Sequence, residues 1–259
     1  MDFEIIDFHT HPFLENRSNL CMHKEVMNLS PDTVFTQLQN FGISRFCGSV
    51  IKMGEETTFQ IIKDCNQDAL KLQQLYKGAF LPGFQVHPAF LEESIAEIDF
   101  AHANGVSLIG ELVPYLHHWE DYACREFSVL LDHIEKYHMA VSLHTGNKEQ
   151  MAQMLQMAKA HPRVNFIFAH PGETATLLRH IEIMKSCPNV HLDISGTGVL
   201  RYGMLKRLVT ECGAERILFG TDYPICNPAL YIASVLSEEI TDSQRQLIFS
   251  GNAKRLLHL

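Results

Sequence analysis

The chain has 259 residues, of which 46% are hydrophobic and 20% charged, so it has the composition of a globular protein and is unlike a disordered one. Its formal net charge of -9 leaves no broad positive field, which argues against nucleic acid or an anionic membrane as a partner. No leader pattern follows Met1, and no apolar run approaches the roughly 18 residues that span a bilayer, so we expect a cytoplasmic protein without a membrane span.

Short β-rich runs alternate with longer stretches of helical period along most of the chain. The predicted strands are Glu4–Phe8, Arg45–Ile51, Ala79–Val86, Val106–Glu111, Ala140–His144, Asn165–His170, Val190–Ile194 and Arg216–Thr221. The predicted helices are 31–41, 57–76, 91–103, 125–137, 148–160, 173–185, 200–210 and 228–237, with a terminal one from about Asp242 to Leu257. Eight parallel strands separated by helices can close into a barrel, so we predict an α/β fold: a single-domain (β/α)8 TIM barrel over residues 1–259 with an extra C-terminal helix.

Two segments that follow predicted strands are too polar or too aromatic to be simple connectors. They run from Pro12 to Ser30 and from Val113 to Cys124. We expect both to overhang, as βα loops, the face at which the strands end, because barrel enzymes place their chemistry on that face.

The first predicted strand ends in His9-Thr10-His11. Histidines two positions apart on a strand point to the same side, about 6.6 Å apart along the chain, so one ion can contact both. The chain has 15 histidines, and a single pair with this spacing is therefore a weak signal. Its position at the end of a strand strengthens it.

Other side chains that bind metals follow the same placement at predicted strand ends. They are Glu111, His144, His170 and Asp222. One histidine after an apolar strand is more often structural, but strand ends converge on one face of a barrel, and the joint pattern favours a metal site. The alternative role for Glu111 is to orient a metal-binding histidine without contacting the ion itself. We predict that a divalent ion is held by His9, His11, Glu111, His144, His170 and Asp222.

Four segments of the chain match motifs of a known family. Asp7-Phe8-His9-Thr10-His11 resembles the first-strand H-x-H of the amidohydrolase superfamily, and especially of its amidohydrolase family 2 branch. In the same way, Ala169-His170-Pro171-Gly172 resembles the sixth-strand histidine, and Gly220-Thr221-Asp222-Tyr223-Pro224 the eighth-strand signature. Gly251-Asn252-Ala253-Lys254-Arg255-Leu256 is similar to the closing helix motif. The resemblance spans nearly the whole chain and implies a metal-dependent barrel enzyme.

The fourth strand departs from a frequent pattern of that superfamily, in which a carboxylated lysine bridges two metals. This chain has Glu111 there, which is similar to TatD-type nucleases, where a glutamate bridges metals. In the decarboxylases of the same branch, typified by aminocarboxymuconate semialdehyde decarboxylase, one zinc suffices and no fourth-strand ligand is used. The resemblance leaves the number of ions at one or two, and Glu111 favours hydrolysis.

Imidazoles and carboxylates suit Zn²⁺, with Mn²⁺ or another divalent ion as alternatives. Bound zinc lowers the pKa of water from about 15.7 towards 7 and so supplies a nucleophile at neutral pH. Asp222 is the expected proton acceptor, and His170 is the second catalytic candidate. The leading hypothesis is therefore a metal-dependent hydrolase that cleaves an amide, lactone or ester bond of a small molecule.

Four residues near the same face are candidates for binding the substrate. His87, at the end of the third strand, can hydrogen-bond a substrate oxyanion or be structural. Tyr115 and Trp119 lie in the loop after Glu111, where they form an aromatic lid or pack on the rim of the barrel. Arg201 pairs either with a substrate carboxylate or phosphate or with a surface acid.

Three rival functions stay open. The same metal site also suits the non-oxidative decarboxylation or hydration of an unsaturated carboxylic acid. It is adequate for phosphodiester cleavage, to which the acidic charge balance gives little support. A barrel that retains metal without turnover is the alternative that is not an enzyme. The substrate and the oligomeric state are not fixed by the sequence, with which a homo-oligomer is compatible.

Overall fold

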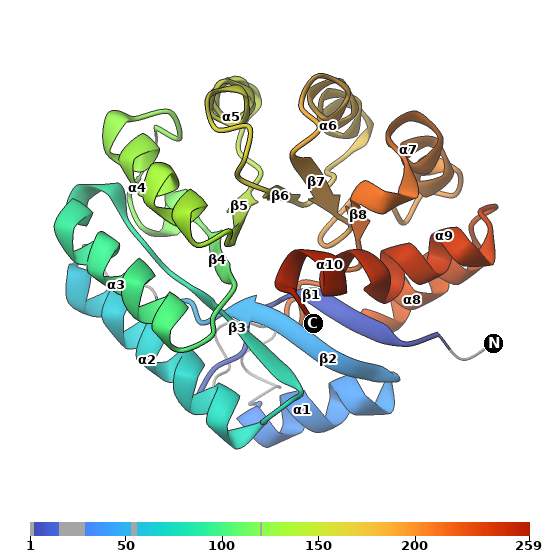
Figure 1. Cartoon of the computed structure of the whole chain (residues 1–259). Helices are drawn as coiled ribbons and strands as arrows, with labels where there is room; N and C mark the ends of the chain where they lie inside the picture. The colour runs from blue at the N-terminus through green and yellow to red at the C-terminus, as the bar shows by residue number, and fades with distance from the viewer. Residues whose placement is uncertain (1–2, 16–28, 53–55, 120) are drawn as a thin grey trace.

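The computed structural model describes residues 3–15, 29–52, 56–119 and 121–259. In this part of the chain, eight parallel strands form one sheet in sequence order from β1 to β8. Figure 1 shows the strands at the centre of the molecule with helices around them. The strands are β1 (Ile5–Thr10), β2 (Ile43–Ser49), β3 (Phe80–Phe84), β4 (Leu108–Leu112), β5 (Ala140–His144), β6 (Phe166–Ala169), β7 (Val190–Asp193) and β8 (Ile217–Leu218).

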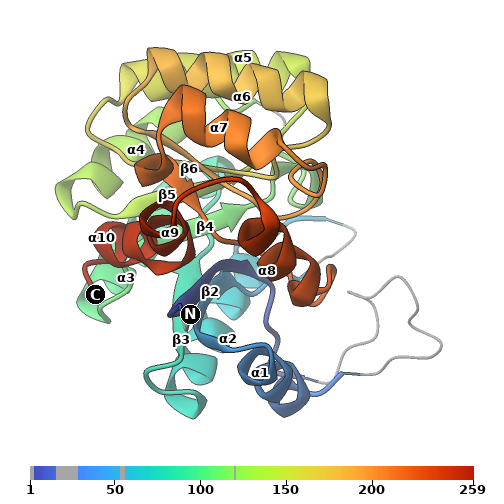
Figure 2. The same cartoon turned by 90° about the vertical axis from the view of Figure 1, so that its right-hand side faces the viewer.

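Helices connect the strands and cover the outer face of the sheet (Figures 1 and 2). They are α1 (Pro31–Asn40), α2 (Phe59–Leu75), α3 (Leu91–Ala103), α4 (Arg125–Lys136), α5 (Lys148–Ala160), α6 (Thr174–Ser186), α7 (Met204–Cys212), α8 (Pro228–Ser237), α9 (Asp242–Gln246) and α10 (Asn252–Leu257). Short 3-10 turns lie at Pro88–Phe90, Pro114–Leu116 and Ala214–Arg216. This alternation confirms the predicted (β/α)8 barrel, and α3, α5, α8 and β5 have the predicted bounds.

Local chemistry accounts for where several elements start and why the strands are buried. Ser30 accepts a hydrogen bond from the Thr33 N–H at the start of α1, and Pro31 takes the first helical position. Asn147 begins α5 with a capping box. All four residues of β6 are buried and apolar, as a parallel strand requires when side chains cover it on both faces.

The eighth strand is shorter than the predicted run Arg216–Thr221. After Leu218 the chain leaves the regular ladder, because its backbone groups bond to two different elements. The Phe219 N–H donates to the Ile248 carbonyl, while the Phe219 carbonyl accepts from the Phe8 N–H at 2.8 Å. The Asp222 N–H then donates to the His9 carbonyl, also at 2.8 Å. These contacts close the barrel between β1 and the chain after β8.

The predicted C-terminal helix is present but is not continuous. Between α9 and α10 a π-helical turn spans Leu247–Gly251, and its Ile248 carbonyl accepts the bond from Phe219. Three buried side chains of α10 pack with apolar residues inside the barrel, including Ile6 and Leu218. Figure 1 shows α10 in front of the strands near the centre of the barrel. The terminal helix therefore covers one end of the barrel interior; the packing residues of α10 are Ala253, Leu256 and Leu257.

Of the two segments expected to be βα loops, one lies mostly outside the described residues and the other follows a strand as predicted. The loop predicted from Pro12 to Ser30 falls mainly on residues 16–28, which lie outside the described residues. The loop from Val113 to Cys124 follows β4 as expected and is described except at residue 120.

Among the described residues, no helix combines the length and the apolar character that a membrane span requires.

Asn252, which is fully buried at the start of α10, supports the join between this helix and β8. Its side-chain amide donates to the carbonyls of Ala214 (2.7 Å) and Ile217 (2.8 Å). We predict that Asn252→Ala lowers the free energy of unfolding by about 1–3 kcal/mol, because it removes donors from buried carbonyls. Urea unfolding measures this change. Asn104→Ala, which removes an exposed bond to the Phe100 carbonyl, is the control and should cost under about 0.5 kcal/mol; equal losses would contradict the prediction.

Candidate metal centre

The structure brings all six predicted ligand residues to one end of the barrel. His9 and His11 come from the end of β1, and Glu111 lies in β4. The other three are His144, the last residue of β5, His170, directly after β6, and Asp222, in the chain that follows β8. Glu111 is 4% exposed and contacts all four of these histidines. The strand-end placement inferred from the sequence therefore corresponds to a real cluster of donor atoms.

One group of donors surrounds a common point. His9 Nε2 and His11 Nε2 are 3.2 Å apart. Glu111 Oε2 lies 3.3 Å from the first nitrogen and 3.2 Å from the second. Asp222 Oδ1 lies 3.6 Å and 3.3 Å from the same two atoms. Four ligands at about 2.0–2.1 Å around a tetrahedral ion are about 3.3 Å from one another, so this donor group fits Zn²⁺ or an ion of similar size.

The other oxygen of Glu111 faces a second group of donors. Glu111 Oε1 is 3.0 Å from His144 Nδ1 and 3.4 Å from His170 Nε2. The rings of these two histidines are 4.7 Å apart and nearly perpendicular. We call His9, His11, Asp222 and Glu111 Oε2 the first donor group, and His144, His170 and Glu111 Oε1 the second. One carboxylate thus lies between both groups.

Asp222 gives an independent indication that a cation belongs here. Its Oδ1 is buried and makes no hydrogen bond to any residue that the structure describes, although two imidazole nitrogens lie close to it. A buried carboxylate oxygen that accepts no hydrogen bond is costly. A divalent ion between Asp222 and the imidazoles of His9 and His11 would satisfy it, so the residues present fit such an ion.

The electrostatics of the cluster favour positive charge. Burial alone would lower the pKa of His9, but Glu111 and Asp193 outweigh it and raise that pKa well above its usual value. Conversely, burial would raise the pKa of Glu111, and the surrounding histidines, His9 first, hold it well below its usual range. The buried cluster therefore stabilises a cation, whether that cation is a proton or a metal.

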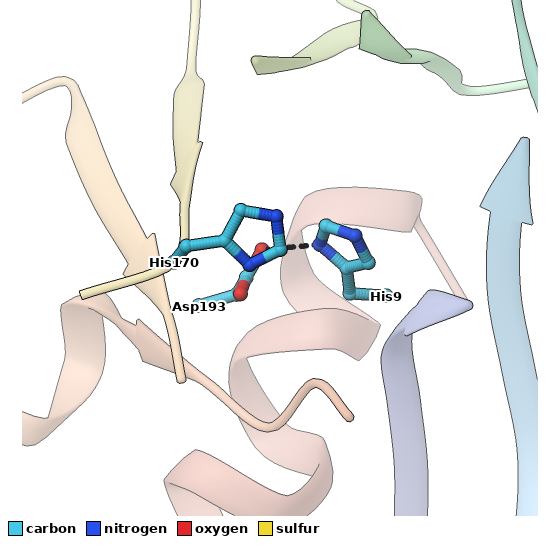
Figure 3. A group of neighbouring side chains, drawn as sticks. All are labelled: His9, His170 and Asp193. Carbon is cyan, nitrogen blue, oxygen red and sulfur yellow. Dashed lines mark hydrogen bonds and ion pairs between the residues drawn. The ribbon is translucent and has the colours of Figure 1, made fainter. Parts of the chain in front are cut away.

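A carboxylate that the sequence analysis missed lies behind His9. Asp193, the last residue of β7, accepts a hydrogen bond from His9 Nδ1 at 2.9 Å and is fully buried. Ser195 Oγ contacts Asp193 and lies 3.0 Å from His170 Nδ1. Figure 3 shows Asp193 beside both imidazole rings. Although Asp193 could itself join a ligand set with His9 and His170, its bond to Nδ1 leaves His9 Nε2 facing the first donor group, so we assign it an orienting role.

Asp7 is a second buried carboxylate that the sequence analysis did not assign. Its Oδ1 accepts from the backbone N–H groups of His9 (3.1 Å) and Thr221 (3.0 Å), and Oδ2 accepts from the Thr221 hydroxyl at 2.5 Å. Burial raises the pKa of Asp7 to about 7. The residue ties the end of β1 to the turn that carries Asp222. For both Asp7 and Asp193, the available signal was an acidic residue within a predicted buried strand.

The four predicted substrate-binding residues differ in their surroundings. Tyr115 is 62% exposed, and its ring centroid lies 5.0 Å from that of His144. Trp119 is buried against Phe127, and its indole N–H donates to the Asp121 carbonyl. His87 Nε2 donates to the His117 carbonyl, and Arg201 pairs with Glu173 at the surface at 3.0 Å. Tyr115 and Trp119 both line a cavity of about 740 Å³.

The charge on His11 predicts how metal binding responds to pH. Burial would lower its pKa, but Asp222 and Glu111 raise it to about 9, against about 6.5 in an unfolded chain. This charge stabilises the metal-free fold below about pH 6.5 and is lost as the pH rises through 9. Metal binding needs neutral imidazoles, so we predict that binding at pH 7 releases protons and that affinity rises by at least about tenfold per unit between pH 7 and 9. Calorimetry in buffers of different ionisation heat measures both; an affinity independent of pH would contradict the assignment.

The chain resembles known proteins both in sequence and in fold. The sequence model of the family described as "Amidohydrolase" (Amidohydro_2) matches residues 6–259. The structure of 2,6-dihydroxybenzoate decarboxylase from Rhizobium is similar, with a TM-score of 0.78, 16% identity and 99% of each chain covered. No curated protein matches the sequence.

Two further solved structures have the same fold. Dihydroxybenzoic acid decarboxylase from Polaromonas sp. JS666, with bound manganese and the inhibitor 2-nitroresorcinol, has a TM-score of 0.76 at 14% identity and covers 99% of this chain and 97% of its own. The 5-carboxyvanillate decarboxylase LigW from Sphingomonas paucimobilis has a TM-score of 0.72 at 14% identity and covers 99% of both chains. Because the family model matches nearly the whole sequence, the resemblance inferred from the motifs is confirmed: this chain belongs to the amidohydrolase family Amidohydro_2.

Proposed function

We propose that this protein is a metal-dependent hydrolase that cleaves an amide, lactone or ester bond of a small molecule. The observation that carries the proposal is the position of Glu111, whose two carboxylate oxygens face two separate donor groups. A carboxylate shared between two ions is typical of sites that clamp the attacking and leaving oxygens of a hydrolytic reaction. The structure of the donor set supports one or two divalent ions.

When bound, the divalent ions would polarise the scissile carbonyl and lower the pKa of water. The side chains of this chain would supply the remaining steps. Asp222, whose Oδ1 faces His9 and His11, accepts the proton of the attacking water and returns it to the leaving group. His170, held at Nδ1 by Ser195, keeps its Nε2 directed at Glu111. Tyr115 contacts the ring of His144 and also lines the cavity of about 740 Å³, which would receive the remainder of the substrate.

Zn²⁺ is our first choice of ion, because the spacing of the first donor group suits a tetrahedral site. Manganese is the alternative, since the Polaromonas decarboxylase was solved with bound manganese. The small-molecule substrate, the cytoplasmic location and a homo-oligomeric state also stay predictions.

Non-oxidative decarboxylation on the same site is the second candidate. The comparisons favour it over hydrolysis, because the three similar structures described above are all named as decarboxylases of aromatic acids. In that reaction a substrate carboxylate leaves as carbon dioxide, and a proton replaces it on carbon. Asp222 would donate that proton, so the same residue would be used in the opposite direction.

An assay that measures both products separates the two candidates. Metal-loaded protein would be incubated with a panel of amides, lactones and esters and, separately, with hydroxybenzoic acids. Hydrolysis predicts free acid and amine or alcohol from the first panel. Carbon dioxide release from the second panel alone would overturn our first choice in favour of decarboxylation.

Asp222→Asn should lower either turnover by about 100-fold or more, because it keeps an oxygen ligand but cannot exchange the proton. Asp64→Asn on α2 is the control, and unchanged turnover in the Asp222 variant would remove Asp222 from this role.

The metal content of a Glu111 variant tests whether Glu111 is shared. If its carboxylate serves both donor groups, Glu111→Ala should lower the ratio of bound metal to protein after dialysis, because each group loses a ligand. Metal analysis by mass spectrometry gives this ratio. Glu149→Ala, which removes a carboxylate from the cavity wall, should bind as much metal as the natural protein. An unchanged ratio in the Glu111 variant would argue against sharing.

A further inference from the structure

Thr145 directly follows the proposed ligand His144, and its hydroxyl reaches the neighbouring strand. The hydroxyl donates a hydrogen bond to the carbonyl of Ala169, the residue immediately before His170. In the sheet, His144 is the register partner of Ala169. One hydroxyl therefore joins the ends of β5 and β6, one residue away from both histidines of the second donor group.

A buried histidine on α6 holds this hydroxyl from behind. His180 is completely buried, and its Nε2 lies 3.1 Å from Thr145 Oγ1. Because the hydroxyl proton is donated to Ala169, Thr145 Oγ1 accepts from the Nε2–H of His180. His180 Nδ1 has no hydrogen-bond partner among the described residues. The imidazole thus uses its N–H on Thr145, at the cost of burying a polar ring.

The backbone of His170 depends on such support. Its φ of 65° lies in the left-handed region, which residues other than glycine seldom adopt. Such a conformation persists where surrounding contacts hold it. Thr145 fixes the carbonyl just before His170, and Ser195 holds the His170 ring at Nδ1. The side chain is therefore anchored on its backbone side and on its ring.

We propose that Thr145 and His180 are a pair of positioning residues that set the distance between His144 and His170 and so shape the second donor group. The proposal rests on the two-group metal site of the proposed function. Neither residue is a predicted ligand, and the first donor group is held by other contacts, among them Asp193 and Asp7. Disturbing the pair should therefore weaken the binding of one ion selectively.

Zinc titration of the metal-free protein, followed by calorimetry, tests the pair. Thr145→Val keeps the shape of the side chain and removes the hydroxyl, whereas Thr145→Ser keeps the hydroxyl. We expect Thr145→Val to lower the zinc affinity of the second donor group by about 10–100-fold, as is usual when a contact behind a metal ligand is lost. The zinc affinity of the first donor group should stay within about threefold. Thr145→Ser should restore the second ion. His180→Met should reproduce the selective loss.

The control is Thr210→Val, which removes a hydroxyl bond to the Lys206 carbonyl on α7, far from the site in the fold, and should leave both ions unchanged. Thermal unfolding of each metal-free variant shows that it is folded. If the natural protein binds two ions and Thr145→Val leaves the affinity for the second ion unchanged, the positioning role of Thr145 and His180 is wrong while the two-group site stands. Equal weakening of both ions would overturn it too. A natural protein that binds a single ion would overturn the two-group site and this proposal with it.

Discussion

A carboxylate buried inside a protein is stable only where positive charge or hydrogen bonds compensate for lost water. Glu111 meets this condition with four imidazoles, two on each side, and they hold its pKa well below the usual range against the opposing effect of burial. Its main-chain carbonyl is held as well, by Gln85 Nε2 at 2.7 Å and Ser49 Oγ at 3.1 Å. The arrangement of the site depends on this residue, since it is the point at which donors from β1, β5 and β6 meet.

The barrel makes this meeting geometrically simple. Several parallel strands deliver one or two side chains each to the same end, and residues of neighbouring strands, loops and helices orient those side chains. Asp193 orients His9, Ser195 orients His170, and His180 reaches the strand ends from α6. The proposed ligands are therefore fixed by neighbours that are distant in sequence. Because the side chains are already ordered, less conformational entropy is lost when an ion binds.

Much of the fold was predictable, because alternating strands and amphipathic helices leave a strong periodic signal. The run Ala140–His144 and the helix over 148–160 show this directly. The short β8 was not predictable, since its truncation depends on a tertiary bond from Phe219 to Ile248. Strand-end position also indicated which donor side chains would lie close together. It did not reveal Asp193, which the same rule would have included, or His180, whose role depends on a helix packing against two strand ends.

Loop conformation decides which of the predicted substrate-binding side chains point at the cluster. Tyr115 contacts His144, whereas Arg201 pairs with Glu173 instead.

The seam between β1 and β8 has a consequence for the molecule as a whole. No continuous ladder joins these two strands in the described chain; individual bonds do so, among them the contact of Asp7 with Thr221, 214 positions away in the sequence. The first donor group lies on this seam, with His9 and His11 on one side and Asp222 on the other. An ion shared by them would bind the folded chain and not the unfolded one, and would therefore stabilise the state in which the two ends of the barrel are joined. The bound cation would then stabilise the closed barrel, and the same side chains would serve both catalysis and folding stability.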